Sequence, residues 1–252
     1  MTEGAMLSGK NAIITGVNRG IGLATLRLFA ASGCNVWACC RKPSESFTQE
    51  IAQLQEKHSV WIEPVYFDLQ NSEEMKSAIK SIREKKEKVD ILVNNAGIEQ
   101  KGSLFQMTSM DVFRQIFEVN VFAQIEFSRY ITNLMMRNRS GSVVNLISVA
   151  GLDMTGGYMA YSASKAAMAS VTKTMAAELC SYGIRVNGVA PGIAQTDMAM
   201  SLTEQARENT KAASLMQRIA APEEIAAVIR FLASDDASYM TGQIVRADGG
   251  MA

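Results

Sequence analysis

The chain has few of the residues from which metal sites, disulfide frameworks and hydrolytic triads are built. Its 252 residues include one histidine and four cysteines. His58 lies in a polar, lysine-flanked stretch, so hydrolysis through a Ser–His–Asp triad is not expected. The cysteines, Cys34, Cys39, Cys40 and Cys180, lack the spacing of zinc ligands or of a disulfide framework. We therefore expect no metal site and read the cysteines as small buried hydrophobes in a reducing cytosol.

Net charge and long apolar runs are lacking as well. Lys plus Arg and Asp plus Glu both number 25, so there is no electrostatic reason to bind nucleic acid or an anionic membrane. No apolar run approaches the roughly 20 residues that span a bilayer. The amino terminus has neither the basic start nor the apolar stretch of a signal peptide. These absences predict a cytoplasmic protein without nucleic-acid or membrane partners.

What the chain does contain is enough apolar sequence for a large core. Hydrophobic residues make up 48% and charged residues 20%, which argues against disorder. We find no repeat, low-complexity tract or interdomain linker. A single domain over residues 1–252 is the expected organisation.

Short apolar runs alternate with segments of helical period. The predicted strands are 11–15, 35–40, 61–67, 90–94, 142–148, 185–190 and 243–246, and the predicted helices are 20–32, 44–57, 72–86, 109–138, 158–181 and 222–233. Ser72, followed by two glutamates, is the expected N-cap of the third helix. Strands that are apolar on both faces and alternate with helices predict an α/β fold. We expect a doubly wound parallel sheet of about seven strands, with helices on both faces.

A glycine-rich loop, TGVNRGIG at 15–22, follows the first strand and opens a helix. Glycines there let the backbone turn tightly and approach a pyrophosphate, while the helix N-terminus offers unpaired N–H groups. This position predicts a dinucleotide site. The candidate cofactor residues of the loop are Gly16, Asn18, Arg19, Gly20 and Ile21.

The end of the second strand lacks the acidic residue that NAD-preferring proteins place against the ribose hydroxyls. This chain has Cys40 there, followed by Arg41. Arg41 and Arg19 offer guanidinium groups suited to a 2′-phosphate, which favours NADP(H) over NAD(H).

Two further segments fit a dinucleotide site. Asp68 and Leu69 follow the third strand, where the Asp68 carboxylate is placed to accept from the adenine amino group. Residues 94–97 (NNAG) end the fourth strand, at the carboxyl edge where such sheets bind ligands. An ordinary turn is the alternative interpretation of the two asparagines.

Ser148, Tyr161 and Lys165 are the candidate catalytic residues. Ser148 ends the fifth strand, and the Tyr-x-x-x-Lys spacing puts Tyr161 and Lys165 on one helical face. A tyrosine pKa is ordinarily near ~10, and we expect the adjacent ammonium to lower it. Such a tyrosine exchanges a proton with an alkoxide or an alcohol, while a serine hydroxyl holds the substrate oxygen. The alternative is that Tyr161 only packs with its hydroxyl hydrogen-bonded.

Together these motifs resemble the classical short-chain dehydrogenase/reductase family over essentially the whole chain. The matching segments are TGVNRGIG (15–22), NNAG (94–97), Asn120 within FEVNVF, Ser148, YSASK (161–165), RVNGVAPG (185–192) and ADGG (247–250). The resemblance implies a Rossmann fold, a homotetramer, and an NADPH-dependent oxidoreductase that interconverts carbonyl and alcohol groups.

The resemblance also implies roles for individual residues. Tyr161 would be the proton donor, Lys165 its activator and a ribose ligand, and Ser148 the residue that orients the carbonyl. Asn120 would support Lys165 through a water-linked relay, although from the residues alone it is equally a structural hydrogen-bonder. The further cofactor contacts that the resemblance implies are Asn94, Ala96, Gly97, Pro191, Gly192, Ile193 and Thr196.

Within the family, the chain is most similar to 3-oxoacyl-[acyl-carrier-protein] reductases of fatty acid biosynthesis, through NRGIG, PGIAQTDM and PEEIA. This implies a small-molecule carbonyl substrate, a 3-oxoacyl thioester either free or bound to an acyl carrier protein. Those reductases keep a basic residue just before the glycine that precedes the sixth strand, where this chain has Tyr182. Arg129 and Arg137 are candidates to replace it.

Other functions stay open. The substrate alternatives are another ketone, a ketosugar or a steroid-like alcohol, and a different class of function is a non-catalytic NADPH-binding protein. A sugar-nucleotide epimerase or dehydratase would usually carry a larger substrate domain after Pro191. In the methionine-rich segment that follows, we hypothesise an apolar pocket walled by Met154, Met198 and Leu202, with core packing as the alternative.

Overall fold

Seven parallel strands form one sheet in the order β3-β2-β1-β4-β5-β6-β7. The computed structural model describes residues 6–100, 102–153, 156–196 and 204–251. The strands are β1 (Asn11–Thr15), β2 (Asn35–Cys40), β3 (Ile62–Tyr66), β4 (Ile91–Asn94), β5 (Gly141–Leu146), β6 (Ile184–Pro191) and β7 (Ile244–Ala247). The chain runs outward from β1 to β3, returns to β4 and continues outward to β7. This confirms the doubly wound parallel sheet predicted from the sequence.

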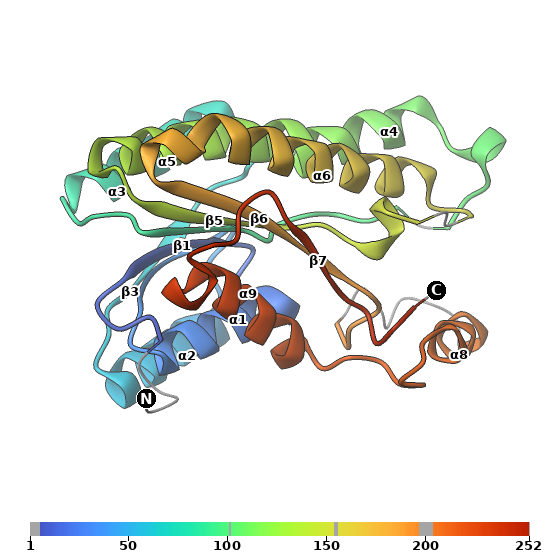
Figure 1. Cartoon of the computed structure of the whole chain (residues 1–252), viewed down its shortest axis with the longest axis horizontal. Helices are drawn as coiled ribbons and strands as arrows, with labels where there is room; N and C mark the ends of the chain where they lie inside the picture. The colour runs from blue at the N-terminus through green and yellow to red at the C-terminus, as the bar shows by residue number, and fades with distance from the viewer. Residues whose placement is uncertain (1–5, 101, 154–155, 197–203, 252) are drawn as a thin grey trace.

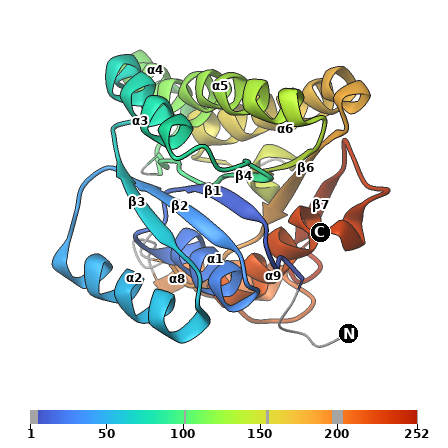
Figure 2. The same cartoon turned by 90° about the vertical axis from the view of Figure 1, so that its left-hand side faces the viewer.

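Helices cover both faces of the sheet (Figures 1 and 2). One layer consists of α1 (Gly20–Ala31), α2 (Glu45–His58) and α9 (Pro222–Ala233). The opposite layer consists of α3 (Ser72–Glu84), α4 (Met110–Phe117), α5 (Ala123–Asn138) and α6 (Met159–Leu179). Helix α8 (Glu204–Ala213), which the sequence did not predict, lies at the same end of the molecule as the carboxy terminus in Figure 1.

Successive strand residues enter two different hydrophobic cores, which explains why the strands are apolar throughout. In β1, Ile14 packs in the core that contains Phe29 of α1 and Ile229 of α9. Its neighbour Ile13 packs in the other core, with Phe127 of α5. Because side chains alternate across a strand, a sheet covered on both faces needs apolar residues at every position.

The helix expected at 109–138 is interrupted. A π-helical turn, η2 (Glu118–Phe122), separates α4 from α5. Within it, the Asn120 amide accepts from the Ile98 N–H at 2.9 Å and donates to the Ile98 carbonyl at 2.8 Å. The widened turn therefore comes with a side chain that holds the loop after β4. Such turns commonly lie at functional sites.

The expected cap of α3 is also corrected. Asn71, not Ser72, is the N-cap residue, and its side chain accepts from the N–H groups of Glu73 and Glu74 at 3.1 and 3.2 Å. Ser72 lies inside the first turn and donates to Glu126 of α5. Asparagine and serine are similarly good caps, so the sequence did not distinguish the two neighbours.

No helix in the described part of the chain is both long enough and apolar enough to cross a bilayer.

The carboxyl ends of β1 and β4 are joined by Thr15 and Asn95. The Thr15 hydroxyl accepts from the N–H groups of Asn95 and Ala96, both at 3.0 Å. The Asn95 amide donates to the carbonyls of Thr15 and Gly16 at 2.8 and 3.1 Å. The loops that follow the two strands are thus fixed against each other.

Replacing Asn95 by alanine should destabilise the fold, because it leaves two partly buried carbonyls without their donor. We expect Asn95→Ala to lower the free energy of unfolding by about 1–3 kcal/mol, measured by urea-induced unfolding. The matched control is Gln243→Ala, which removes one exposed amide bond to the Thr241 carbonyl and should change stability by less than about 0.5 kcal/mol. Equal effects of the two variants would contradict the role assigned to Asn95.

Candidate active site

A cavity of about 780 Å³ lies along the carboxyl edge of the sheet and joins residues that are distant in sequence. Its wall includes most of the predicted site residues, namely Gly16, Asn18, Arg19, Gly20, Ile21, Arg41, Asp68, Leu69, Ala96, Gly97, Ser148, Tyr161, Lys165, Pro191, Gly192, Ile193 and Thr196. Two predicted residues, Asn94 and Asn120, are not part of this wall.

The glycine loop has the backbone that its sequence requires. Gly16 and Gly20 have φ values of +72° and +54°, in the left-handed region that favours glycine. A Cβ on Gly22 would lie 2.1 Å from the Gly16 carbonyl oxygen, so the first turn of α1 packs directly on the loop.

The N-terminus of α1 faces the cavity through Gly20 and Ile21. Among the described residues, no side chain caps this helix, and its first turn contains no acidic residue. The N–H groups of the first turn therefore face the cavity with the positive end of the helix dipole, an arrangement that suits a phosphate.

The wall at the end of β2 carries no carboxylate from that strand. Cys40 is buried there, and burial raises the pKa of its thiol, so the group is uncharged. Arg41 follows on the surface and lines the cavity, as does Arg19 from the glycine loop. Asp68, after β3, also lines the cavity, and its carboxylate accepts from the N–H of Gln70 at 2.9 Å.

The three candidate catalytic residues meet at the other end of the cavity. Ser148 follows β5 in extended backbone, and its hydroxyl accepts from the Ala150 N–H at 3.2 Å. Tyr161 and Lys165 lie on successive turns of α6. Lys165 is 5% exposed and donates to the Leu146 carbonyl at 2.7 Å, which holds the ammonium against the end of β5.

The pKa of Tyr161 differs from the sequence-based expectation. Burial raises the pKa of Tyr161 to about 12, a hydrogen bond with Ser148 opposes this rise, and the Glu99 carboxylate adds to it. The Lys165 ammonium lies 5.8 Å from the ring centroid and is held by Leu146, so it does not offset the loss of solvent around the phenol. The expected lowering is therefore wrong for this arrangement, and Tyr161 is a neutral phenol at neutral pH.

Burial acts on Lys165 in the opposite direction. It lowers the pKa of the ammonium to about 8, because the charged form loses its hydration. The pair therefore combines a protonated tyrosine with a lysine that loses its charge in mildly alkaline solution.

The prediction for Asn94 is corrected by its position. Its side chain is 3% exposed and donates to the Ser128 hydroxyl and the Asn145 amide oxygen, both at 2.8 Å. It therefore ties β4 to β5 and α5 inside the core. The next residue, Asn95, faces the cavity instead.

Asn120 lies behind the wall and not in it. It is 1% exposed, holds both polar groups of the Ile98 backbone, and donates to the Ser164 hydroxyl at 3.1 Å. A Cβ on Gly97 would lie 3.2 Å from the Asn120 amide oxygen and 3.6 Å from the Lys165 Nζ. Asn120 and Lys165 therefore both lie next to Gly97, where a side chain would meet them.

Sequence reasoning missed several residues of this region. Glu99, Tyr158 and Met251 line the cavity. Gln100 is 3% exposed and accepts from the Ala160 N–H at 3.0 Å, so it caps the helix that carries Tyr161. No local motif marks these positions, although Glu99 and Gln100 directly follow the NNAG segment.

The hypothesised apolar wall of Met154, Met198 and Leu202 lies outside the described residues. In the part of the chain that the structure describes, no group of three or more His, Cys, Asp or Glu side chains is placed to hold a metal ion.

A family model described as enoyl-(acyl carrier protein) reductase, a short-chain dehydrogenase/reductase model, matches residues 16–252. The chain belongs to the short-chain dehydrogenase/reductase family. It is accordingly an oxidoreductase that acts on carbonyl and alcohol groups, in a family that uses a nicotinamide cofactor.

Relatives in this family carry more than one activity in their names. A 3-oxoacyl-[acyl-carrier-protein] reductase of Thermotoga maritima is 38% identical over 247 residues, 97% of this chain and 98% of the relative. A 7alpha-hydroxysteroid dehydrogenase of Paraclostridium sordellii is 35% identical over 97% of this chain and 92% of the relative. Among solved structures, a 3-oxoacyl-[acyl-carrier protein] reductase of Brucella melitensis has a TM-score of 0.87 at 29% identity, covering 98% of this chain and 92% of that one.

Proposed function

We propose that this short-chain dehydrogenase/reductase reduces a carbonyl with NADPH, through Ser148, Tyr161 and Lys165. One observation carries the proposal. A serine, a half-buried neutral tyrosine and a buried lysine meet at one end of the cavity, and the other end presents Arg19 and Arg41.

The groups that line the cavity suit the charged and polar parts of NADPH. The uncapped first turn of α1 suits the pyrophosphate, and the two arginines suit a 2′-phosphate in the absence of a carboxylate at the end of β2. Asp68 and Leu69 would contact the adenine, and Ala96, Gly97 and Lys165 the ribose. The residues left for the nicotinamide side are Pro191, Gly192, Ile193 and Thr196. When bound, NADPH supplies the hydride.

The chain's own residues handle the proton. Ser148 donates a hydrogen bond to the substrate oxygen, and Tyr161 gives its phenolic proton to that oxygen as negative charge develops. The Lys165 ammonium, 5.8 Å from the centre of the Tyr161 ring, then attracts the phenolate more strongly than it did the neutral phenol, for which its charge does not offset the effect of burial. Because Tyr161 starts as a neutral phenol, the site is prepared for reduction, and alcohol oxidation first requires removal of that proton.

For the substrate we propose a 3-oxoacyl thioester, free or carried by an acyl carrier protein. The support is the activity in the names of the 3-oxoacyl reductases, which match nearly the full chain. A steroid-like alcohol or another ketone is the second candidate, favoured by the hydroxysteroid dehydrogenase relative and by Tyr182 at the position of the missing basic residue. Arg129 and Arg137 are exposed on α5 and do not line the cavity.

We further propose that residues 1–252 form one domain and that the protein is a homotetramer. The single seven-stranded sheet supports the first proposal. The side chains of Met110 and Phe122, 59% and 56% exposed on the outer helical layer, support a buried interface there.

Removal of the Tyr161 hydroxyl should abolish turnover. We expect Tyr161→Phe to reduce kcat for acetoacetyl thioesters and simple ketones by about 100-fold or more, because the proton donor is lost. NADPH affinity, measured by calorimetry, should stay within about twofold, well below the tenfold that corresponds to 1.4 kcal/mol.

The matched control is Tyr130→Phe on α5, which changes a tyrosine outside the cavity wall and should leave kcat unchanged. Full activity in Tyr161→Phe would exclude the proposed mechanism. A wild-type protein that binds NADPH and reduces no carbonyl would favour the non-catalytic alternative.

Cofactor preference should depend on Arg41. We expect Arg41→Ala to weaken NADPH binding about tenfold, equivalent to about 1.4 kcal/mol, with NADH binding changed less than twofold. Lys42→Ala, next in sequence and outside the cavity wall, is the control and should change neither affinity. Equal losses of affinity for NADPH and NADH would show that Arg41 does not contact a 2′-phosphate.

The pH dependence of carbonyl reduction should follow Lys165. Its charged form is present below its pKa of about 8 and is lost as pH rises through that value, so kcat should fall above about pH 8. Tyr161, with a pKa of about 12, remains protonated over this range and is not the source of the decrease. In Lys165→Arg, whose guanidinium stays charged, kcat should be lower but independent of pH up to about 10. The same alkaline decrease in this variant would assign it to another group.

A further inference from the structure

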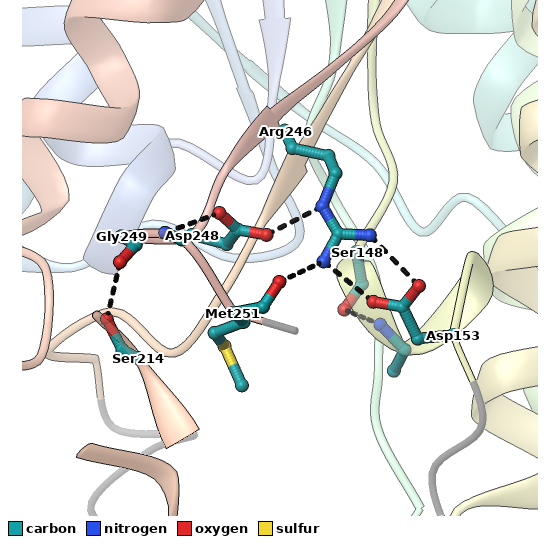
Figure 3. A network of polar contacts seen from close by, with 9 residues as sticks. Ser148, Asp153, Ser214, Arg246, Asp248, Gly249 and Met251 are labelled. Atoms are coloured by element: carbon teal, nitrogen blue, oxygen red, sulfur yellow. Dashed lines mark hydrogen bonds and ion pairs between the residues drawn. The ribbon is translucent and has the colours of Figure 1, made fainter. Parts of the chain in front are cut away.

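Arg246 of β7 joins the segment that follows Ser148 to the segment 248–251 (Figure 3). Its guanidinium donates to one carboxylate oxygen of Asp153 at 2.9 Å and forms an ion pair with the other at 2.7 Å. It also donates to Asp248 at 2.7 Å and to the Met251 carbonyl at 3.0 Å. Asp153 follows the short helix η3 (Val149–Gly151) that Ser148 begins, so the pair reaches the segment next to a candidate catalytic residue.

The segment 248–251 is held from both sides. The Asp248 carboxylate, 8% exposed, accepts from the Gly250 N–H at 3.0 Å as well as from Arg246. On the opposite side, Ser214 donates to the Gly249 carbonyl at 2.9 Å. Gly249 and Gly250 have φ values of +67° and +78°, so the segment turns sharply between these two anchors.

This turn brings Met251 into the cavity wall. A Cβ on Gly192 would lie 3.0 Å from the Met251 sulfur and 3.0 Å from the Asp248 Cα, so the segment packs directly on the end of β6. Met251 therefore lies beside Gly192, which the proposed function places at the nicotinamide, and in the same cavity as Ser148 and Tyr161. A methionine side chain is apolar and flexible, so it can pack against an apolar group that enters this part of the cavity.

We propose that Arg246 is a positioning residue that fixes the segment 248–251, so that Met251 forms a wall of the substrate end and limits the size of the apolar group beside the carbonyl. This inference rests on the proposed function and adds the residues that select the substrate.

The geometry favours positioning over stabilisation as the role of Arg246. The Arg246 and Asp153 side chains are 35% and 44% exposed, and ion pairs with such exposure contribute little to stability. Yet one guanidinium holds two carboxylates and a backbone carbonyl in fixed directions, which is what a planar, multidentate donor does well. Lys cannot reproduce all four contacts.

The test measures reduction of a series of methyl ketones and 3-oxo esters whose second substituent grows from methyl to phenyl. Met251→Ala should raise kcat/KM for the bulkiest substrates about tenfold relative to the smallest one, because the shorter side chain leaves more space in the cavity. Arg246→Gln should raise KM and flatten the dependence on substituent size while kcat on the smallest ketone and the Kd of NADPH stay unchanged. Arg246→Lys should restore part of the size dependence.

The matched control is Arg27→Gln. Arg27 also makes a two-pronged ion pair, with Glu50 at 2.7 and 2.9 Å, but it joins α1 to α2 outside the cavity wall. It should leave the substrate series unchanged. An unaltered size dependence in both Met251→Ala and Arg246→Gln would overturn the proposal.

A second measurement does not depend on turnover. Hydrogen–deuterium exchange should become faster in residues 149–153 and 247–251 of Arg246→Gln and stay unchanged in Arg27→Gln. Unchanged exchange in Arg246→Gln would overturn the positioning role of Arg246, whatever the activity of the variant. If exchange is faster in Arg246→Gln but the wild-type protein reduces no carbonyl, Arg246 does position the segment 248–251 and the proposed function is wrong.

Discussion

The structure depends on an irregular stretch of backbone, residues 95–100, that crosses the centre of the carboxyl edge and pairs several of its backbone polar groups with side chains. Thr15 accepts two of its N–H groups, Asn120 pairs with both polar groups of Ile98, and Gln124 donates to the Ala96 carbonyl at 2.7 Å. Buried backbone groups outside helices and strands must find such partners. Here the partners come from β1, η2 and α5, so the same bonds fix the cavity and connect the elements around it.

This constraint extends to the candidate catalytic residues. Gln100, the last residue of the stretch, caps α6, and Asn120 contacts Ser164 in the same helix. The position and rotation of α6 are thereby tied to the loop after β4, and with them the direction of Tyr161 and Lys165. This close packing removes solvent from both side chains. The loss of solvent raises the pKa of Tyr161 and lowers the pKa of Lys165. A tyrosine prepared as an acid thus follows from the packing more than from the neighbouring charge.

The sequence predicted the fold well because its signals are local. Apolar runs of strand length, a glycine loop directly after the first of them and a Tyr-x-x-x-Lys pair each specify their own geometry within a few residues. Asn94 and Asn95 show where local signals become insufficient. Both are amides at the predicted edge, but alternation along β4 turns Asn94 into the core and leaves Asn95 to face the cavity. The direction of each side chain depends on the register of β4 against β5, and that register is set by contacts between residues far apart in sequence.

The cofactor and catalytic residues are likewise marked by local sequence signals, whereas the residues proposed to select the substrate depend on contacts between distant segments. The glycine loop and the Tyr161–Lys165 pair lie within single short segments, so a motif can describe them. Arg246 and Asp153 are 93 residues apart and meet only because β7 lies beside β6, next to β5 and the helix that follows it. Neither residue belongs to a motif that the sequence offered, and Met251 reaches the cavity only through a turn that these contacts hold. A fold with one shared reaction can therefore change its substrate through pairs such as this one, without altering the residues that perform the chemistry.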